Sequence, residues 1–477
     1  MDDKIEIAEW WLPSNPEQRV HGALSWDPAD GASLTLLDML LEVRTSQFYA
    51  PTVLGETFDG VALTLMHPVV ANHADRLTPT RSWTRSTLLA STMLRGHHVS
   101  DPDAFVFSRA VVRFAGLRDV CLQEWPSGED GEWVPFVTPG LGARQANVIG
   151  GSLLFRQRQR RTEGKYSEAS ETDVDVVICS DNPLSLADFD DQWLNPLEAL
   201  TILAARGPTV LQQMVLAVVD DDGAEHEVEV LTRTPSLAPK PQEEYKPLVR
   251  LATLGQGAMP FIARWWDLYQ GLGPAADFLS SALSGEMFVE QKLVAAMSFL
   301  ESYHRNLHRV ALVSPEEHRQ NVESMIATLD LEDHKSRYRV LLDRAIEQSA
   351  RERAEAFIVR AHETLPGVPG LDSTLAKDLV NARNAVAHLS RSISKVLKGL
   401  DLTYAVARLR LVLQVNLLLD LGLDSDLVAS MVFTSYEGGM PIVDYREDHQ
   451  AAAKPSAGQS TKGAMAAAPR VRGSSNL

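Results

Sequence analysis

Residues 379–391 read LVNARNAVAHLSR, and this stretch decides how the second half of the chain is interpreted. Apolar residues recur every three or four positions through it and beyond, which predicts one helix from about 372 to 399, capped by Asp372 or Ser373. Arg383, Asn384 and His388 fall off the apolar stripe and are expected on a polar, outward-facing surface. The predicted buried stripe consists of Val386, Leu389, Ile393, Val396, Leu397 and Leu400.

These three residue types suit the cleavage of RNA. The 2′-hydroxyl of RNA attacks the adjacent phosphate if a base takes its proton, an acid protonates the 5′-oxygen and a cation stabilises the phosphorane. Histidine exchanges protons near neutral pH, and the guanidinium fork binds phosphate oxygens. We therefore take Arg383, Asn384 and His388 as the candidate catalytic residues, with Asn384 holding the phosphate or orienting the histidine. This chemistry requires no metal and no cofactor.

The competing interpretation of the same residues is a solvated helix surface. From the arginine and histidine content of the chain, about one Arg-x4-His spacing is expected by chance. A single helix also supplies only one such histidine. Two-group catalysis would follow if two copies met across a two-fold axis, so a homodimer or higher homo-oligomer is part of the ribonuclease hypothesis.

Composition excludes some classes of protein. The chain has 477 residues and a formal net charge of −18, which opposes nonspecific coating of nucleic acid but allows a recessed cleavage site. Two distant cysteines, Cys121 and Cys179, give no disulfide framework. The N-terminus lacks the charged-then-apolar order of a signal peptide. The apolar run from 411 to 423 is too short and too polar to span a bilayer, so a cytoplasmic protein without membrane contact is expected.

Two patterns divide the chain into an α+β multidomain protein. From about residue 5 to 235, period-two runs at 61–65, 173–176 and 227–230 are separated by turn signals, which predicts a sandwich- or barrel-like β domain with one helix near 196–205. A proline-rich stretch at 232–248 is typical of an exposed linker. From about 258 to 435 the spacing is helical. Residues 447–477 are small and polar and are predicted to be disordered.

Several motifs resemble one known family. FLESYHRNLHR at 299–309, followed by NARNAVAHLSR at 381–391, is similar to the HEPN domain (higher eukaryotes and prokaryotes nucleotide-binding) of the ApeA-like kind. The signature of that family is Arg-x4–6-His, commonly with asparagine after the arginine. WWLPSNPEQRVHGALSWDPADGASLTLL at 10–37 resembles the ApeA N-terminal domain, and RWWDLYQGLGPAADFLSSAL at 264–283 resembles the usual passage between the two.

The resemblance implies an order of domains and a function. It implies an ApeA-like regulatory domain over 5–275, an all-α HEPN bundle over 280–435 and a tail over 447–477 outside the family. It further implies a metal-independent endoribonuclease with a dimeric site, acting in bacterial anti-phage defence and leaving 2′,3′-cyclic phosphate and 5′-hydroxyl ends. The partners would be RNA, with tRNA as one candidate, and an unidentified phage trigger. Glu301, His304 and Arg391 are supporting site candidates, and Glu301 would pair with Arg383 or form a structural salt bridge.

Two alternatives remain open at this stage. The HEPN-type bundle would be a catalytically silent module that binds a nucleotide or dimerises. Alternatively, the β-rich domain would carry the main function as a ligand-binding module, with the helices serving as a dimerisation handle.

Overall fold

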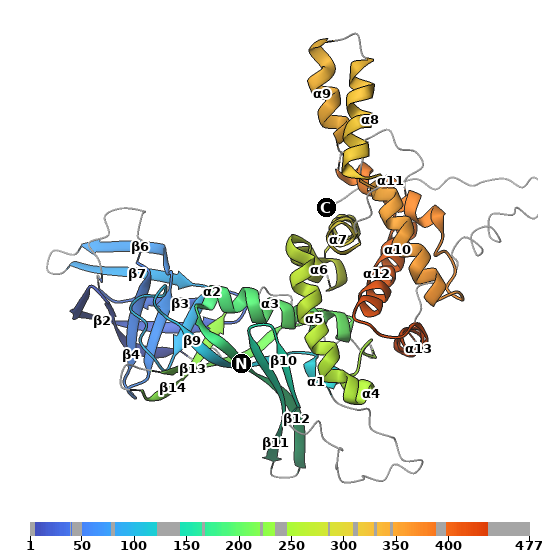
Figure 1. Cartoon of the computed structure of the whole chain (residues 1–477). Coiled ribbons are helices and arrows are strands. Elements are labelled where there is room, and N and C mark those ends of the chain that lie inside the picture. The colour runs from blue at the N-terminus through green and yellow to red at the C-terminus, as the bar shows by residue number, and fades with distance from the viewer. Residues whose placement is uncertain are drawn as a thin grey trace, which may run out of the picture.

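The structure is a computed structural model with a β-rich N-terminal part and a helical C-terminal part (Figure 1). This division confirms the predicted fold class. His388, Arg391, most of the predicted linker and the tail over 447–477 lie outside the described residues. The described ranges are 5–38, 40, 50–77, 82–121, 144–164, 167–219, 223–233, 246–284, 287–308, 313–328, 332–343, 347–387 and 397–436.

The described strands form one 14-stranded antiparallel sheet in the order β10-β11-β12-β9-β13-β14-β8-β5-β4-β1-β2-β3-β7-β6. The predicted period-two runs at 61–65, 173–176 and 227–230 lie in β5, β12 and β14. The strands are β1 (Glu6–Leu12), β2 (Asn15–Asp27), β3 (Gly31–Leu36), β4 (Thr52–Thr57), β5 (Ala62–Met66), β6 (Val69–Leu77), β7 (Ser82–Ala90), β8 (Thr92–Arg95), β9 (Phe107–Phe114), β10 (Arg144–Val148), β11 (Gly151–Gly164), β12 (Ser167–Leu184), β13 (Leu211–Val219) and β14 (Glu225–Thr232).

The half of the sheet that contains β1 to β8 curls around a core of its own. Inward side chains of β1, β2, β3, β4, β5, β7 and β8 pack into one cluster that includes Trp10, Leu34 and Leu63. β3 also contacts β8, which lies at the other side of this half. Trp10 is fully buried, and its ring occupies the space beside Gly55 of the adjacent strand. This curvature gives the N-terminal half the barrel-like character predicted from its short, regularly spaced strands.

The first helices lie between strands of the β-rich part, and after β14 all the described elements are helical. The predicted helix near 196–205 is α3, which packs beside the second half of the sheet (Figure 1). The described helices are α1 (Leu117–Cys121), α2 (Leu186–Phe189), the π-helical η1 (Asp190–Leu194), α3 (Asn195–Ala205), α4 (Leu251–Leu254), the 3-10 turns η2 (Gly255–Gly257) and η3 (Gly273–Ala275), α5 (Ala258–Leu272), α6 (Ala276–Ser284), α7 (Val289–Leu307), α8 (Pro315–Ala327), α9 (Glu332–Asp343), α10 (Ala350–Thr364), α11 (Ser373–Ala387), α12 (Leu400–Asp420) and α13 (Ser425–Ser435).

One hydrophobic core joins the other half of the sheet, which contains β9 to β14, to the helices. It runs from Val112 of β9 and Ile178 of β12 through Trp266 of α5 to Leu300 of α7 and Leu413 of α12. The indoles of Trp265 and Trp266 also donate hydrogen bonds to carbonyls at 196 and 192. In contrast, α8 and α9 form a hairpin that projects away from the bundle (Figure 1).

The helix α12 runs through the bundle. Its length and composition alone would allow it to cross a membrane, yet 67% of its apolar window is buried inside the protein. The predicted apolar run at 411–423 covers its second half and ends three residues beyond it, and the helix starts eleven residues earlier, at Leu400. The polar residues that interrupt the run are Gln414, Asn416 and Asp420. The first two are buried, and Asn416 donates hydrogen bonds to the carbonyls of Phe357 and Val412.

Candidate functional site

Arg383 and Glu301 form an ion pair between α11 and α7. Arg383 Nη2 lies 3.5 Å from Glu301 Oε1, and this oxygen is shielded from solvent and accepts no hydrogen bond among the described residues. Arg383 Nη1 also donates a 3.1 Å hydrogen bond to Asn384 Oδ1. A guanidinium has five N–H donors, and these are the contacts of Arg383 within the described part of the chain. The remaining donors are available to an anion, because 31% of the side chain is exposed.

The local sequence explains how α11 presents this arginine. The predicted cap is Asp372, whose Oδ1 accepts hydrogen bonds from the backbone N–H groups of Thr374 and Leu375. The helix then buries Leu375, Ala376, Leu379 and Ala382 against its neighbours α7, α10 and α12.

Three details of the predicted helix are wrong. Within the described residues, the buried face of α11 is formed by residues 375–382, which precede the predicted stripe in sequence, and Val386 is only half-buried. Leu400 is 57% exposed and begins α12 after Gly399, which has a φ of 55°. In addition, Arg383 and Asn384 are half-buried rather than fully outward-facing, because α7 packs beside them. Gly399, the approximate end of the predicted helix, is the residue that precedes α12, and its left-handed backbone favours glycine.

Glu301 lies between two arginines. On the α10 side, Arg353 Nη1 donates a 3.5 Å hydrogen bond to the backbone carbonyl of Glu301, and its Nη2 contacts Glu347 Oε2 at 2.7 Å. The Arg353 side chain is 6% exposed. Glu301 therefore occupies a fixed position on α7, from which its carboxylate orients Arg383. The predicted pairing of these two residues is present in the structure, whereas their role in catalysis stays a prediction.

His304 follows Glu301 by one helical turn and is buried in the bundle. Its ring packs against Phe357 at a centroid distance of 5.4 Å. Burial, together with the electrostatic effect of the neighbouring His308 and Arg353, lowers the pKa of His304 to about 4. The imidazole is therefore neutral at pH 7. A neutral, interior histidine packs the helices and is poorly suited to donate a proton to a leaving group near neutral pH.

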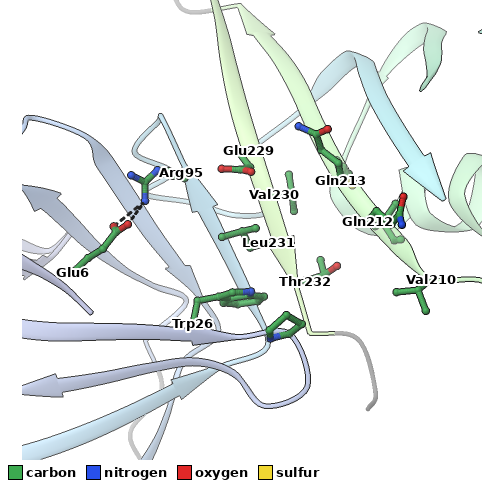
Figure 2. A pocket seen from close by; sticks show the side chains of 13 residues that line it. Glu6, Trp26, Arg95, Val210, Gln212, Gln213, Glu229, Val230, Leu231 and Thr232 are labelled. Carbon is green, nitrogen blue, oxygen red and sulfur yellow. Dashed lines mark hydrogen bonds and ion pairs between the residues drawn. The ribbon is translucent and has the colours of Figure 1, made fainter. Parts of the chain in front are cut away.

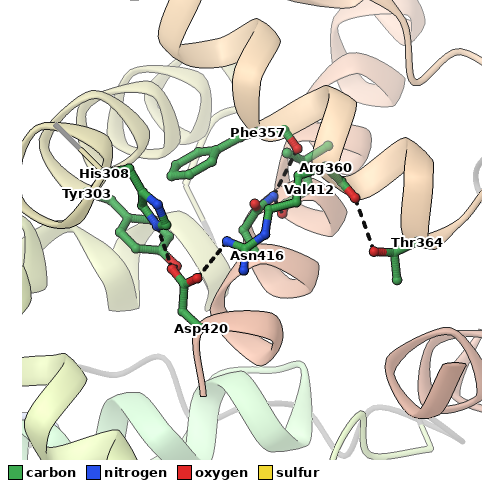
Figure 3. A network of polar contacts seen from close by, with 8 residues as sticks. All are labelled: Tyr303, His308, Phe357, Arg360, Thr364, Val412, Asn416 and Asp420. Atoms are coloured by element: carbon green, nitrogen blue, oxygen red, sulfur yellow. Dashed lines mark hydrogen bonds and ion pairs between the residues drawn. The ribbon is translucent and has the colours of Figure 1, made fainter. Parts of the chain in front are cut away.

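A second polar cluster lies at the far end of α7, and sequence reasoning missed it (Figure 3). The carboxylate of Asp420 accepts hydrogen bonds from Tyr303, from His308 Nε2 at 2.6 Å and from Arg360 Nη1 at 2.6 Å. Burial alone would raise the pKa of Asp420, but the hydrogen bonds from His308, Tyr303 and Arg360 bring it below its usual value. The only sequence signal was the pair of histidines four residues apart in YHRNLH, residues 303–308.

This Asp420 cluster connects the C-terminal ends of α7 and α12 to α10. Burial and the neighbouring Asp420 carboxylate raise the pKa of Tyr303 well above its usual value, so its hydroxyl stays a donor. The three donors to Asp420 come from different turns or helices, and its carboxylate accepts a hydrogen bond from each of them. The cluster therefore fixes the helix on which Glu301 lies.

The described residues bring together only part of the predicted site. Arg383 contacts both Asn384 and Glu301, and His304 lies in the interior one turn away from Glu301 on α7. The description of α11 ends at Ala387, so His388 and Arg391 fall outside it. Among the residues that the structure describes, no group of three or more His, Cys, Asp or Glu side chains is placed to hold a metal ion.

Comparison with known families gives two matches along the chain. A family described as ApeA N-terminal domain 1 matches residues 6–121, and a family described as Apea-like HEPN matches residues 294–427. The two occur in the predicted order, and the second contains both Arg383 and Glu301. No curated protein and no solved structure matches the chain.

Proposed function

Because this chain carries an ApeA N-terminal domain followed by an ApeA-like HEPN domain, and so belongs to the ApeA-like HEPN family, we propose that it is a metal-independent endoribonuclease of anti-phage defence. The single observation that carries this proposal is the Arg383–Glu301 pair. It holds a partly exposed guanidinium on the helix that leads directly to His388. HEPN domains are generally nuclease-like. What we propose beyond this is that the chain cleaves RNA, by the step described below, and that a phage component triggers it.

In the proposed reaction, Arg383 binds a non-bridging oxygen of the scissile phosphate. Asn384 accepts a hydrogen bond from one of its N–H groups, and the carboxylate of Glu301 attracts the guanidinium, so that together they aim the remaining N–H groups. His388 takes the proton of the 2′-hydroxyl, whose oxygen attacks phosphorus as the bond to the 5′-oxygen breaks. A second histidine protonates that leaving oxygen. The products are a 2′,3′-cyclic phosphate and a 5′-hydroxyl, so no water, oxidant or metal enters the balance.

His304 does not supply the second proton in this scheme, because burial keeps it neutral well below pH 7. The second histidine is instead His388 of another copy of the chain. The proposal therefore includes a homodimer in which two α11 helices meet across a two-fold axis. The β-rich domain would restrain or release this site in response to a phage component.

The test compares purified full-length protein with its His388→Ala and Arg383→Ala variants on end-labelled tRNA and total RNA, with EDTA present. Wild-type protein is expected to leave 2′,3′-cyclic phosphate ends, and each variant is expected to be slower by about 100-fold or more. Arg351→Ala, which alters an exposed arginine on α10, serves as the control. Cleavage that survives His388→Ala, or that disappears with the chelator, would contradict the mechanism. An intact dimer that binds RNA without cutting it would instead support a catalytically silent module.

Mixing wild type with an excess of the His388→Ala variant tests the composite site. A mixed dimer then holds one wild-type and one His388→Ala subunit, and so carries only one of the two histidines that the reaction needs. We expect the excess variant to suppress the cleavage by the wild-type subunits if both subunits contribute to one phosphate site. If each subunit works alone, the wild-type subunits keep their full activity in the mixture.

A further inference from the structure

The strands β13 and β14 pair only along part of their length. Their register runs from Val219↔Glu225 to Val215↔Glu229 and then stops. Continuing it would pair 214 with 230, 213 with 231 and 212 with 232. Instead the two strands diverge below their hairpin (Figure 2), and all six of these residues line a cavity of about 480 Å³. The cavity is a fork within the sheet.

Each branch of the fork is paired on its outer side only. Leu211, Gln213 and Met214 of β13 pair with β9, whereas Val230, Leu231 and Thr232 of β14 pair with β8. Successive residues of a strand direct their backbone N–H and C=O groups to alternate sides. Alternate residues on both branches therefore direct these groups into the fork, where the described residues provide no strand to receive them. Such open edges are a template for another extended chain.

The side chains around the fork add two specific features. Trp26 lies toward its open end, near Thr232 (Figure 2), and provides an aromatic surface. Arg95 is already engaged, because its Nη1 lies 2.6 and 2.8 Å from the two carboxylate oxygens of Glu6. The side chain of Glu229, directly opposite Arg95 in the register, has no hydrogen bond or ion pair among the described residues. Two carboxylates and one guanidinium leave the lining with one net negative charge.

We propose that this fork binds an extended peptide segment of a partner protein that carries a lysine or arginine side chain. The segment adds as a strand between β13 and β14, and its backbone satisfies the open N–H and C=O groups on both sides. Its basic side chain reaches Glu229, and an apolar neighbour packs on Trp26. The volume is within the range of sites that enclose a small ligand or a few residues of peptide, roughly 300–1,000 Å³. This site is independent of the ribonuclease proposal, because it lies entirely within the β-rich half.

The experiment selects binders from a displayed library of random ten-residue peptides, using immobilised full-length protein. Parallel selections use Glu229→Arg and the matched control Glu227→Arg, which places the same charge change two residues along β14, outside the cavity. We expect wild type and Glu227→Arg to enrich peptides with lysine or arginine among alternating β-branched residues. Glu229→Arg is expected to enrich acidic peptides instead.

The best wild-type peptide is then synthesised and measured with each protein. Its affinity should fall about tenfold for Glu229→Arg, fall for Trp26→Ala and stay within about twofold for Glu227→Arg. Hydrogen exchange should show new protection of amides over 212–214 and 230–232 when the peptide binds. The proposal is overturned if no peptide is enriched, if Glu229→Arg binds the peptide as tightly as wild type, or if protection appears elsewhere.

Discussion

Glu301 lies on α7, and His308 directly follows Leu307, the last residue of that helix, yet the two side chains contact different helices. Glu301 faces Arg383 of α11, and His308 faces Asp420 of α12. The same helix thus positions the candidate phosphate-binding arginine at one level and is fixed by the Asp420 cluster at another. Variants at the two levels should therefore differ in kind, with activity affected at the first and stability at the second.

Arg383→Lys tests the first level. Lysine keeps the positive charge but lacks the planar fork needed to contact Glu301, Asn384 and a phosphate together. We expect RNA cleavage to fall by about 100-fold, while the midpoint of thermal unfolding stays close to that of wild type. Arg351→Lys, in an exposed pair with Glu355, should change neither quantity. If Arg383→Lys cleaves RNA at the wild-type rate, the guanidinium geometry is unimportant for the reaction.

Asp420→Asn tests the second level. The amide cannot accept hydrogen bonds from all three donors as the carboxylate does, and it leaves Arg360 without a counter-charge. We expect a loss of about 3 kcal/mol in the free energy of unfolding, measured with urea. Asp401→Asn, at the exposed start of the same helix, should cost under about 1 kcal/mol. Equal effects of the two substitutions would show that the Asp420 cluster does not stabilise the bundle.

His304 makes the stability of the bundle depend on pH. Its pKa is about 4 in the folded chain against 6.5 for the free side chain, so only the unfolded chain binds the extra proton between these values. Stability is therefore lost as the pH falls through this window, by roughly 3 kcal/mol in total. We expect His304→Phe, which keeps a ring beside Phe357, to lose less stability than wild type between pH 7 and pH 4.5 in urea unfolding.

The comparison with His304→Phe separates the contribution of His304 to the pH dependence of stability from an opposite contribution by Asp190. Burial and the charge of Asp191 raise the pKa of Asp190 to about 6. That carboxyl destabilises the fold as the pH rises through the same range, because the unfolded chain releases its proton first. Wild type and His304→Phe share this effect, so it cancels in the difference. Identical pH profiles for the two proteins would mean that His304 is not buried as a neutral ring.

Gly55→Ala tests the core of the curled half-sheet. A Cβ at this position would lie 2.5 Å from the ring of Trp10, which is fully buried and cannot move aside freely. We expect a loss of about 2 kcal/mol in the free energy of unfolding. Gly257→Ala, where a Cβ would meet nothing within 4 Å, serves as the control and should be close to neutral. A stable Gly55→Ala protein would indicate that the strands can separate locally.

The sequence was most informative where spacing is set by local geometry. The period-two runs located β5, β12 and β14, and helical spacing located the region from 258 to 435. Asp372 was recognisable as a cap because its side chain acts on the next few residues. The fourteen-stranded order was not predictable, since β9 pairs with β12 and β13 across long separations in sequence. Pairing of distant strands depends on tertiary packing that no local pattern encodes.

The candidate site was predictable only as far as the family motif extends. Arg383, Asn384 and Glu301 were named from motif positions, and their contacts agree with that grouping. His304 was grouped with them because it is close in sequence, but a difference of one turn directs it into the interior. Asp420 was invisible because the residues it binds come from two other helices. The fork between β13 and β14 was also unpredictable, since it forms where the hydrogen-bonded pairing of the two strands ends.

The core that connects Ile178 of β12 with Trp266 of α5 and Leu413 of α12 has a practical consequence. The helices that carry Arg383 and the second half of the sheet share one apolar interior, so heating should melt them together in a single calorimetric transition. A fragment that contains the helices alone would expose Trp265 and Trp266 to water and aggregate. A change of packing in this half of the sheet can therefore be transmitted directly to the helix that carries Arg383, because the described residues of both parts share the same core.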